Sequence, residues 1–519
     1  MKAAPGEDSA PEPPRRDMRR HACGAALLLI LAAAVGLRVY RLEHESAFYD
    51  EVASIVVLDA PDLATFFQTY RLSGDIVSPP AYLTAEYLWA HTAGASVHSI
   101  RLLSVLFGVL SILFVYLVAS ELFGQPTGLL SAGVAAVSMT HIYYSQEIRA
   151  YALAMMLSGL SAYSFVKLLH RGGRRWWLLH LAVNALLPLT HLMAAFMLLA
   201  EGLALLALRW RRPGRIIAWG MANACACLPV LLWLVTLDLG FADRSTSWVP
   251  DLSPLAFLGA LPFFAGAWTR WSLMGRYATY SPLDTAATVA LAAVAYAALV
   301  WAVWWALSAG RSTHSGHGDA TRLSGGGGML FILAWLLVPP LALLALSYLW
   351  RPCYVERYVL YSALPFAIVL GAAVGQASKR PAQLAVAALL VVLYAHSLAR
   401  VGGPLRPDWQ GVAQHVHDRG LEGDLVFIRP FWQRDSFRFY SELPDAQIQP
   451  FDDWSVVYRR APEALAAGHA LWAVVFPLGE DLAEFEHGLS TRGLRYDKTV
   501  SNGLIRPLVY HITAPGPGG

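Results

Sequence analysis

The fold of this chain is decided by long apolar stretches, of which the clearest is residues 99–120, SIRLLSVLFGVLSILFVYLVAS. Its one charged side chain, Arg101, lies near the start of the stretch. A helix of roughly 20 apolar residues is long enough to cross the ~30 Å hydrocarbon core of a bilayer. The stretch therefore predicts a membrane-spanning helix.

Similar stretches recur over most of the chain. Its 519 residues are 56% hydrophobic and only 14% charged, whereas about a quarter of the residues of soluble domains are charged. We therefore expect an α-helical polytopic membrane protein of about 11 spans. The predicted spans are 23–41, 99–120, 127–144, 150–169, 176–190, 192–208, 216–238, 283–307, 328–349, 358–376 and 382–399. The fifth and sixth are short and nearly continuous, so a hairpin that does not cross the membrane is an alternative for them.

The loops between these spans differ in charge. Lysine and arginine gather at 15–20, 171–175, 209–215, 311–322 and 379–380. The positive-inside rule places these loops in the cytoplasm. The first loop, 42–98, and everything after residue 400 then lie outside. Four arginines depart from the rule on the outer side and are candidates for binding an anion: Arg270, Arg276, Arg351 and Arg357.

The chain divides into three parts by composition. Residues 1–22 predict a disordered, basic cytoplasmic leader, and 23–399 a transmembrane domain. Residues 400–519 regain charge, and their strand-like runs alternate with helical stretches, which predicts a small extracytoplasmic α/β domain. The strand-like runs are 424–428, 470–476 and 508–512. No glycine-rich phosphate loop follows them, and the net charge of +3 gives no indication of nucleic-acid binding.

Charged side chains gather just outside the predicted spans. Asp50 and Glu51 follow the first span by about ten residues. Charges at a membrane edge are costly and usually face a cavity or a partner. A pair that merely reaches toward water is the alternative, but short acidic side chains do this poorly. The pair therefore predicts proton chemistry or the binding of a polar substrate.

Three further groups lie on the same side. Residues 141–151 include Tyr144, Glu147 and Arg149; the last two do not face each other on a helix and each needs a partner elsewhere. His191 lies at the turn between the fifth and sixth spans, where a lone histidine is more often structural. The run 351–360 contains Arg351, Arg357 and Tyr358. Together these residue types suit group transfer from an anionic donor, because arginine binds phosphate in bidentate fashion and a carboxylate can accept a hydroxyl proton.

Six short motifs occur in order: FYDE at 48–51, SPPAY at 78–82, RLLS at 101–104, YYSQEIRAY at 143–151, ERYVL at 356–360 and DWQGVA at 408–413. The series resembles bacterial membrane glycosyltransferases of the GT-C class, which are related to protein O-mannosyltransferases and to the aminoarabinose transferase that modifies lipid A. It covers most of residues 23–415. The resemblance implies a polyprenyl-phosphate sugar donor, an active site on the outer face of the cytoplasmic membrane, and inversion at the anomeric carbon.

The resemblance also implies roles for individual residues. Asp50 matches the first-loop acid that acts as base or orients the acceptor, and Arg357 matches a basic residue near the donor phosphate. We expect the substrate to be bound by Glu51, Tyr82, Arg101, Tyr144, Glu147, Arg149, His191, Arg351, Arg357 and Tyr358. Inversion needs one base rather than a pair of carboxylates. The acceptor stays open, whether an envelope glycan, a lipid or a protein, because residues 400–519 match no acceptor class.

Two other functions are compatible with the same set of charged and aromatic residues. One is a transporter or flippase of lipid-linked sugars, and the other is a ligase that uses a polyprenyl-diphosphate glycan. Transporters often show internal repeats and charges in mid-membrane, whereas here we find no convincing repeat and the charges lie at the outer edge. No ligand cluster demands a metal, although some membrane glycosyltransferases use a divalent cation. If the chain is a transferase, Asp50, Glu147 and Arg357 should converge in one outward cavity.

Overall fold

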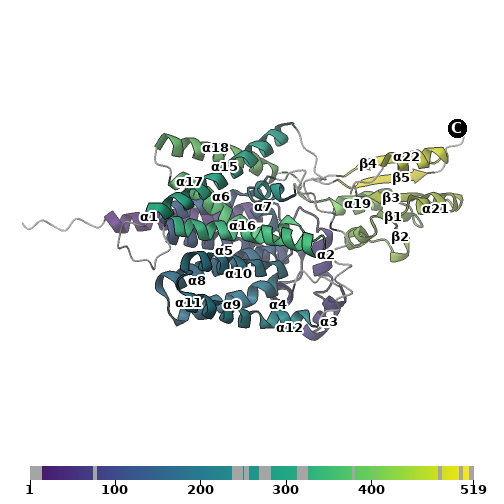
Figure 1. The fold of residues 1–519 in the computed structure, drawn as a ribbon. Coiled ribbons are helices and arrows are strands. Elements are labelled where there is room, and N and C mark those ends of the chain that lie inside the picture. Colours follow the sequence, from purple (N-terminus) through teal and green to yellow (C-terminus); the bar gives the residue numbers. More distant parts are fainter. Residues whose placement is uncertain are drawn as a thin grey trace, which may run out of the picture.

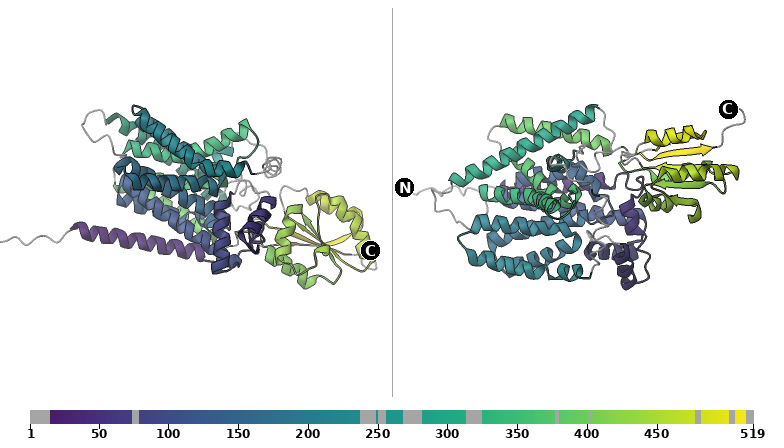
Figure 2. Two further views of the ribbon diagram at one scale, coloured as in Figure 1. Left: turned by 90° about the horizontal axis from the view of Figure 1, so that it is seen from below. Right: turned by 45° about the vertical axis from the view of Figure 1, so that its right-hand side comes forward.

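A computed structural model describes residues 15–73, 79–236, 249, 256–267, 282–312, 325–376, 380–401, 403, 405–476, 482–501 and 506–513. The chain forms a body of packed helices followed by a sheet with its own helices (Figure 1). The N-terminal end of α1 and the C-terminal sheet lie at opposite ends of this body, and the turned views agree (Figure 2). The candidate site lies between the helical body and the sheet.

The helical body contains these elements: α1 (Arg15–Val39), α5 (Val97–Phe123), α6 (Gln125–Val137), α7 (Met139–Ser145), α8 (Tyr151–Arg171), α9 (Arg174–Thr190), η1 (Leu192–Ala195), α10 (Phe196–Arg209), α11 (Pro213–Ala226), α12 (Leu228–Leu234), η2 (Ala256–Gly259), α14 (Ala260–Phe264), α15 (Pro282–Ser312), α16 (Gly326–Leu349), η5 (Glu356–Ser362), α17 (Ala363–Gly375) and α18 (Arg380–Val401). α1 begins at Arg15, so the predicted disordered leader is too long by the eight residues 15–22. Residues 1–14 lie outside the described part.

Within the described residues, seven helices are long and apolar enough to cross a membrane. They are His21–Val39, Val97–Phe123, Tyr151–Arg171, Leu192–Arg209, Pro282–Ser308, Gly326–Leu349 and Glu356–Gly375. Each coincides with a predicted span, so seven of the predicted spans are helices of the required length and apolarity. An eighth would be the pair α11 and α12, which is bent by 41° at Cys227. The total of about 11 spans stays a prediction.

The remaining predicted spans are shorter or broken helices. The span 127–144 divides at Ser138, whose ψ of 121° is extended rather than helical, into α6 and α7. This break leaves carbonyl groups at the end of α6 without helical partners. The guanidinium of Arg38, from α1, donates hydrogen bonds to the carbonyls of Ala135 (3.3 Å) and Ala136 (3.1 Å). A buried arginine therefore compensates for the break within the helical body.

The predicted first outer loop forms three helices, α2 (Tyr49–Ile55), α3 (Leu63–Ser73) and α4 (Pro80–Ala93), of which α2 contacts α20 of the C-terminal part. α4 begins with Pro80 at its first position, where the missing amide is not needed. It ends at Gly94, whose φ of 100° favours glycine. At the start of α2, the Glu51 carboxylate accepts a hydrogen bond from the Phe48 amide (3.0 Å), which fixes where this short helix begins.

The C-terminal part is a five-stranded mixed sheet in the order β2-β1-β3-β5-β4. Its elements are α19 (Trp409–Arg419), β1 (Leu425–Arg429), η6 (Phe431–Gln433), α20 (Arg434–Tyr440), η7 (Asp445–Gln447), β2 (Ile448–Pro450), α21 (Trp454–Ala466), β3 (Leu471–Val475), α22 (Leu482–Thr491), β4 (Arg495–Val500) and β5 (Leu508–Thr513). β1 is parallel to β2 and β3, and β5 is antiparallel to β3 and β4.

Helices cover both faces of this sheet (Figure 2). Alternate residues of β3 belong to different cores: Leu471 packs in the core that includes α21 and α22, and Trp472 in the core that includes α19 and α20. Strands buried on both faces appear in the sequence as continuous apolar runs. β1, β3 and β5 therefore coincide with the predicted strands. β2 has only three residues and β4 is largely polar, so neither was predicted.

Candidate functional site

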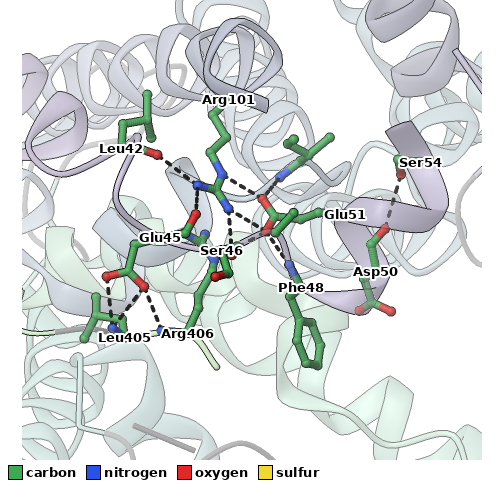
Figure 3. A network of polar contacts seen from close by, with 12 residues as sticks. Leu42, Glu45, Ser46, Phe48, Asp50, Glu51, Ser54, Arg101, Leu405 and Arg406 are labelled. Carbon is green, nitrogen blue, oxygen red and sulfur yellow. Dashed lines mark hydrogen bonds and ion pairs between the residues drawn. The ribbon is translucent and has the colours of Figure 1, made fainter. Parts of the chain in front are cut away.

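The site begins at α2, where Asp50 and Glu51 are neighbours in sequence but face different surroundings. Figure 3 shows the Glu51 side chain pointing toward Arg101 while the Asp50 carboxylate lies apart from that network. Glu51 is fully buried, and the Asp50 side chain keeps 18% of its exposure. The two acids therefore have different chemical surroundings.

Glu51 is the centre of a fully enclosed network. Arg101, from α5, binds both of its carboxylate oxygens at 3.0 and 2.8 Å. The amides of Phe48 and Ile148 also donate to it, at 3.0 and 3.1 Å. Arg406 lies on the remaining side, with its Nε 3.5 Å from Glu51 Oε2. Glu51 thus joins α2, α5, the loop after α7 and the segment before α19.

This network keeps Glu51 ionised. Burial alone would raise the pKa of Glu51, but the charges of Arg101 and Arg406, with hydrogen bonds from Arg101 and Phe48, lower it to about 2. Arg101 is equally occupied, because its Nη1 also donates to the carbonyls of Leu42 and Glu45 (Figure 3). Neither side chain of the Glu51–Arg101 pair is exposed. The pair holds the first loop in place.

Asp50 forms an ion pair with Arg357 of η5, with 3.1 Å between Asp50 Oδ2 and Arg357 Nη2. The Arg357 guanidinium lies 6.0 Å from the centre of the Tyr151 ring. It comes from a segment where Val359 departs from helical geometry, which turns the chain between α16 and α17. A first-loop acid and a distant arginine therefore meet, as predicted from the sequence.

Glu147 lies in the same electrostatic neighbourhood. It is 2% exposed, and its Oε2 accepts no hydrogen bond from the described residues. Burial raises the pKa of Glu147 to about 7; Arg357 and Arg406 oppose the rise, while Glu51 and Asp50 add to it. Three predicted residues, Asp50, Glu147 and Arg357, are thus brought together.

Aromatic rings enclose one side of this group. The His191 ring lies 5.7 Å from the Tyr151 ring and 5.4 Å from the Tyr358 ring. Tyr144 packs edge-on against Tyr151 at 5.3 Å. His191, Tyr144 and Tyr358 are all buried, and they come from three separate segments. The predicted site residues His191, Tyr144 and Tyr358 therefore form one wall beside Arg357.

Tyr82 and Arg149 belong to a neighbouring cluster around Glu86. The Tyr82 hydroxyl contacts the Ser104 hydroxyl at 2.9 Å. Glu86 is fully buried; burial raises its pKa well above the usual value, and the Arg149 charge opposes the rise. Sequence reasoning missed Glu86, although an acid among the largely apolar residues of α4 was a visible signal.

The structure describes two of the four predicted outer arginines, Arg351 and Arg357, whereas Arg270 and Arg276 lie outside the described residues. Arg351 stacks on its neighbour Trp350, with 4.1 Å between the guanidinium carbon and the ring centre. Arg357 forms the ion pair with the first-loop acid Asp50.

Arg406 and Glu45 were not predicted as site residues. Glu45 accepts hydrogen bonds from the amides of Leu405 (3.1 Å) and Arg406 (2.9 Å), and so fixes the segment that carries Arg406. Arg406 lies two residues before the 408–413 motif, which was the available signal. As for metals, the described residues contain no group of three or more His, Cys, Asp or Glu placed to hold an ion.

Comparison with known proteins finds a family model that matches part of the chain. Residues 78–233 match the family model described as dolichyl-phosphate-mannose-protein mannosyltransferase. The resemblance to GT-C membrane glycosyltransferases predicted from the motifs is confirmed over this segment. It includes Tyr82, Arg101, Tyr144, Glu147, Arg149 and His191. No curated protein sequence matches the chain.

Solved structures that match the chain include ArnT from Cupriavidus metallidurans in the apo state, at 16% identity and a TM-score of 0.41, covering 94% of this chain and 98% of that one. ArnT bound to undecaprenyl phosphate gives 15% and 0.40, with 93% and 97% covered. The archaeal oligosaccharyltransferase AglB from Archaeoglobus fulgidus, in complex with an inhibitory peptide and a dolichol-phosphate, gives 13% and 0.48, with 93% and 73% covered.

Proposed function

We propose that this protein is a membrane glycosyltransferase that moves a sugar from a polyprenyl-phosphate donor to an acceptor on the outer face of the bacterial cytoplasmic membrane. The observation that carries the proposal is the Asp50–Arg357 ion pair beside Glu147, built from three distant segments. A partly exposed carboxylate beside an arginine supplies a base and a phosphate-binding group in one place. The family match over residues 78–233 supports the same class of reaction.

The reaction is a single displacement with inversion. Asp50 accepts the proton of the acceptor nucleophile, whose freed lone pair attacks the anomeric carbon of the donor sugar. The bond between that carbon and the phosphate oxygen breaks, and polyprenyl phosphate leaves with the electron pair. Arg357 stabilises the negative charge that develops on the leaving group. The products are the glycosylated acceptor, polyprenyl phosphate and a protonated Asp50.

Arg357 also links donor binding to the base. Asp50 and the donor phosphate compete for the same guanidinium, because both are anions within its reach. A phosphate that binds Arg357 takes the place of Asp50 at the guanidinium and frees the Asp50 carboxylate to accept a proton from the acceptor. The donor thereby prepares Asp50 for the acceptor.

The other predicted residues take supporting parts in this proposal. Glu51 and Arg101 fix α2 and so set where Asp50 lies, because both are enclosed and bound to each other. Tyr144, His191 and Tyr358 form the wall against which the donor is held. Tyr82 and Arg149 extend the site toward Glu86, and Arg351 lies at its edge.

We place the C-terminal sheet outside the cytoplasm, at the same end as the site, with residues 23–399 as the membrane domain. The shorter helices α6, α9 and α18 are proposed to run through the bilayer beside the seven longer ones. The basic N-terminal end of α1 lies at the opposite end of the helical body, which agrees with a cytoplasmic position.

The decisive experiment compares donors with the purified full chain in liposomes. Radiolabelled polyprenyl-phosphate sugars should give label transfer to a membrane extract, whereas nucleotide sugars should not. Transfer from polyprenyl-diphosphate glycans alone would instead make the protein a ligase. Movement of the lipid-linked sugar across the bilayer without transfer would make it a flippase.

A variant identifies the donor site. Arg357→Ala should raise the KM for the donor more than the KM for the acceptor, because the phosphate loses its bidentate partner. Arg460→Ala is the matched control, since that arginine is 60% exposed on α21. Equal increases in both KM values would count against a phosphate role for Arg357.

A further inference from the structure

We infer that Arg406 is a second arginine that binds the donor phosphate, and that docking of the C-terminal segment on the first loop sets its position. This inference rests on the proposed function. It adds that the phosphate site is completed by a residue from beyond the membrane helices, so the transferase site includes the start of the C-terminal part.

Arg406 is buried without enough partners of its own. It is 1% exposed, and its Nε and Nη2 donate no hydrogen bond to the residues that the structure describes. Its ion-pair distance to Glu51 is 3.5 Å, longer than a charge-assisted hydrogen bond. Glu51 already accepts two bonds from Arg101 and two from backbone amides. Buried guanidinium nitrogens left over in this way indicate a ligand.

Arg406 and Arg357 both act on Glu147. The charge of each arginine favours the ionised form of the Glu147 carboxyl. Neither donates a recorded hydrogen bond to Glu147 Oε2. Arg406 lies over the Tyr143 ring at 4.9 Å, and Arg357 over the Tyr151 ring at 6.0 Å. A phosphate between the two arginines would receive donors from both sides, next to Asp50.

The position of Arg406 depends on contacts with the first loop. Glu45 binds the amides of Leu405 and Arg406, and the Ser46 hydroxyl accepts from the Gln410 amide at 3.0 Å. The Tyr440 hydroxyl, from α20, accepts a hydrogen bond from the Ala47 amide. Figure 3 shows Glu45 and Arg406 on the same side of the network as Ser46. Residues 405–440 are thus tied to the residues that lead into Asp50.

The chemistry recognised here is a phosphate, which could belong to a lipid or be free in solution. Three donor sources are therefore compared by direct binding to the full chain in detergent: polyprenyl phosphate, a polyprenyl-phosphate sugar and inorganic phosphate. Binding of the two lipids with little binding of inorganic phosphate is expected. Equally tight binding of inorganic phosphate would overturn the assignment to a lipid donor.

The variants test Arg406 itself. Arg406→Gln should weaken polyprenyl-phosphate binding about tenfold or more, because a hydrogen bond between charged groups is lost. It should leave the KM for the acceptor unchanged, and Arg406→Lys should restore part of the affinity. Arg460→Gln, an exposed arginine on α21, should change neither quantity.

A purely structural role predicts a different result. In that case Arg406→Gln would lower the unfolding temperature and leave the affinity of the remaining folded protein for polyprenyl phosphate unchanged, which would overturn the inference. If Arg406→Gln does not fold, Glu45→Gln provides the second test, because it keeps Arg406 and loosens its backbone. Glu45→Gln should weaken lipid-phosphate binding by a smaller factor, and unchanged binding would overturn the inference.

The two proposals fail in distinguishable ways. Absence of polyprenyl-phosphate binding by the unaltered chain would contradict the proposed function itself. Tight binding by the unaltered chain and by Arg406→Gln alike would contradict only the role of Arg406. Loss of binding in Arg406→Gln with intact folding supports both.

Discussion

Two buried polar clusters in this molecule differ in whether their hydrogen bonds are satisfied, and this difference separates a structural role from a functional one. The first lies in the middle of the helical body, where α8, α9, α10 and α11 meet. It consists of Ser161, Ser164, His180, Asn184, Glu201, Trp219 and Asn223. The second is the outer site around Asp50, Glu147, Arg357 and Arg406. Both are buried, but only the first satisfies its hydrogen bonds.

The donors and acceptors of the inner cluster can be counted. The Trp219 indole can only donate, so His180 Nε2 accepts from it at 3.0 Å and the proton of His180 is on Nδ1, which faces Ser164. His180 is therefore neutral and does not pair as a cation with Glu201, 3.6 Å away.

The same count assigns a proton to Glu201. The Ser161 hydroxyl has one hydrogen but contacts two acceptors, Asn184 Oδ1 at 2.5 Å and Glu201 Oε1 at 2.8 Å. Both contacts are satisfied if the Glu201 carboxyl donates to Ser161, which in turn donates to Asn184. The two amide hydrogens of Asn184 then bind Asn223 Oδ1 and Glu201 Oε2. The inner cluster is complete with a neutral carboxyl and needs no ligand.

The same count of donors and acceptors leaves atoms of the outer site without hydrogen bonds. Glu147 Oε2 and Arg406 Nη2 are buried and have no hydrogen-bond partner among the described residues. Buried polar groups in native proteins are nearly always satisfied, so those that are not need an explanation. A phosphate ligand would accept from the Arg406 nitrogen, and it would satisfy Glu147 Oε2 when the Glu147 carboxyl is protonated and donates to it. Burial alone does not identify a site, and neither do unfilled hydrogen bonds alone, since Trp335 Nε1 and Tyr394 Oη in the helical body are also buried without a partner in the described part of the chain. The outer site differs because its unfilled atoms belong to charged groups that act on one another.

The largest expected effect is on the rate of sugar transfer, and it distinguishes Asp50 from its neighbour Glu51. Asp50→Asn should lower the rate of sugar transfer by about 10²–10⁴-fold, the contribution usual for a general base. The unfolding temperature in detergent should fall less than in Glu51→Gln, because Asp50 is partly exposed and Asn keeps its shape, although Arg357 loses its ion-pair partner. Transfer assays and thermal unfolding on one preparation measure both.

Asp59→Asn is the control for this variant, since Asp59 is an exposed acid of the same loop. Full transfer activity in Asp50→Asn would exclude Asp50 as the base. Lost activity together with an unfolding temperature lowered as far as in Glu51→Gln would make Asp50 structural and erase the contrast with Glu51.

Glu51→Gln should act on stability instead. Removing one member of a buried ion pair leaves its partner uncompensated, which costs about 3–5 kcal/mol. Here two arginines, Arg101 and Arg406, would lose their common counter-charge. A lower unfolding free energy is therefore expected, with activity lost in proportion to the unfolded fraction.

Glu43→Gln provides the comparison for this result, because Glu43 is 68% exposed and should tolerate the change. An unfolding free energy of Glu51→Gln equal to that of the unaltered chain would contradict the structural role. Glu51 would then belong with the substrate-binding residues, as first predicted from the sequence.

The sequence revealed those site residues that stand out from their immediate neighbours in the chain. Charges beside apolar stretches stand out, so Asp50, Glu147 and Arg357 could be found at the edges of predicted spans. Arg406 could not be found in this way, because it lies in a polar segment where an arginine is ordinary. Its importance comes from the docking of that segment on Glu45, a contact between distant parts of the chain.

Some misses had a visible signal. Glu201 is the one acid within the predicted span 192–208, so the expectation that charges lie only at the outer edge is wrong in the structure, where Glu201 is buried in mid-helix. Asn184 and His180 have a helical spacing of four in the preceding span. The break at Ser138 had no local signal, because Arg38 compensates for it from another helix.

A smaller effect concerns pH at the outer site. The raised pKa of Glu147, about 7, means that this group is neutral below neutral pH and anionic above it. Its negative charge repels the donor phosphate, so kcat/KM should fall by up to about tenfold per pH unit above pH 7. A polyprenyl-phosphate sugar is a suitable donor because its phosphodiester does not titrate in this range.

Glu147→Gln should remove this alkaline decline and leave the acid side of the profile unchanged. Between pH 4.5, the ordinary pKa of Glu147, and pH 7, its raised pKa, the folded state holds a proton on Glu147 that the unfolded state releases. The free energy of unfolding of the unaltered chain should therefore fall by about 3 kcal/mol as pH rises through this range. An alkaline decline that persists in Glu147→Gln would assign it to another group.

The smallest expected effect belongs to the inner cluster. Glu201→Gln should change the free energy of unfolding by less than about 1 kcal/mol and leave transfer unchanged, because an amide donates and accepts as a protonated carboxyl does. Glu201→Ala should cost about 2–5 kcal/mol, since it leaves a cavity and strands the polar groups of Ser161 and Asn184. If Glu201 were ionised, its amide replacement would lose charge-assisted bonds worth about 1.5–3 kcal/mol each. Denaturant unfolding of the two variants therefore decides whether the inner cluster holds a neutral acid, and with it whether satisfied hydrogen bonds distinguish the scaffold from the site.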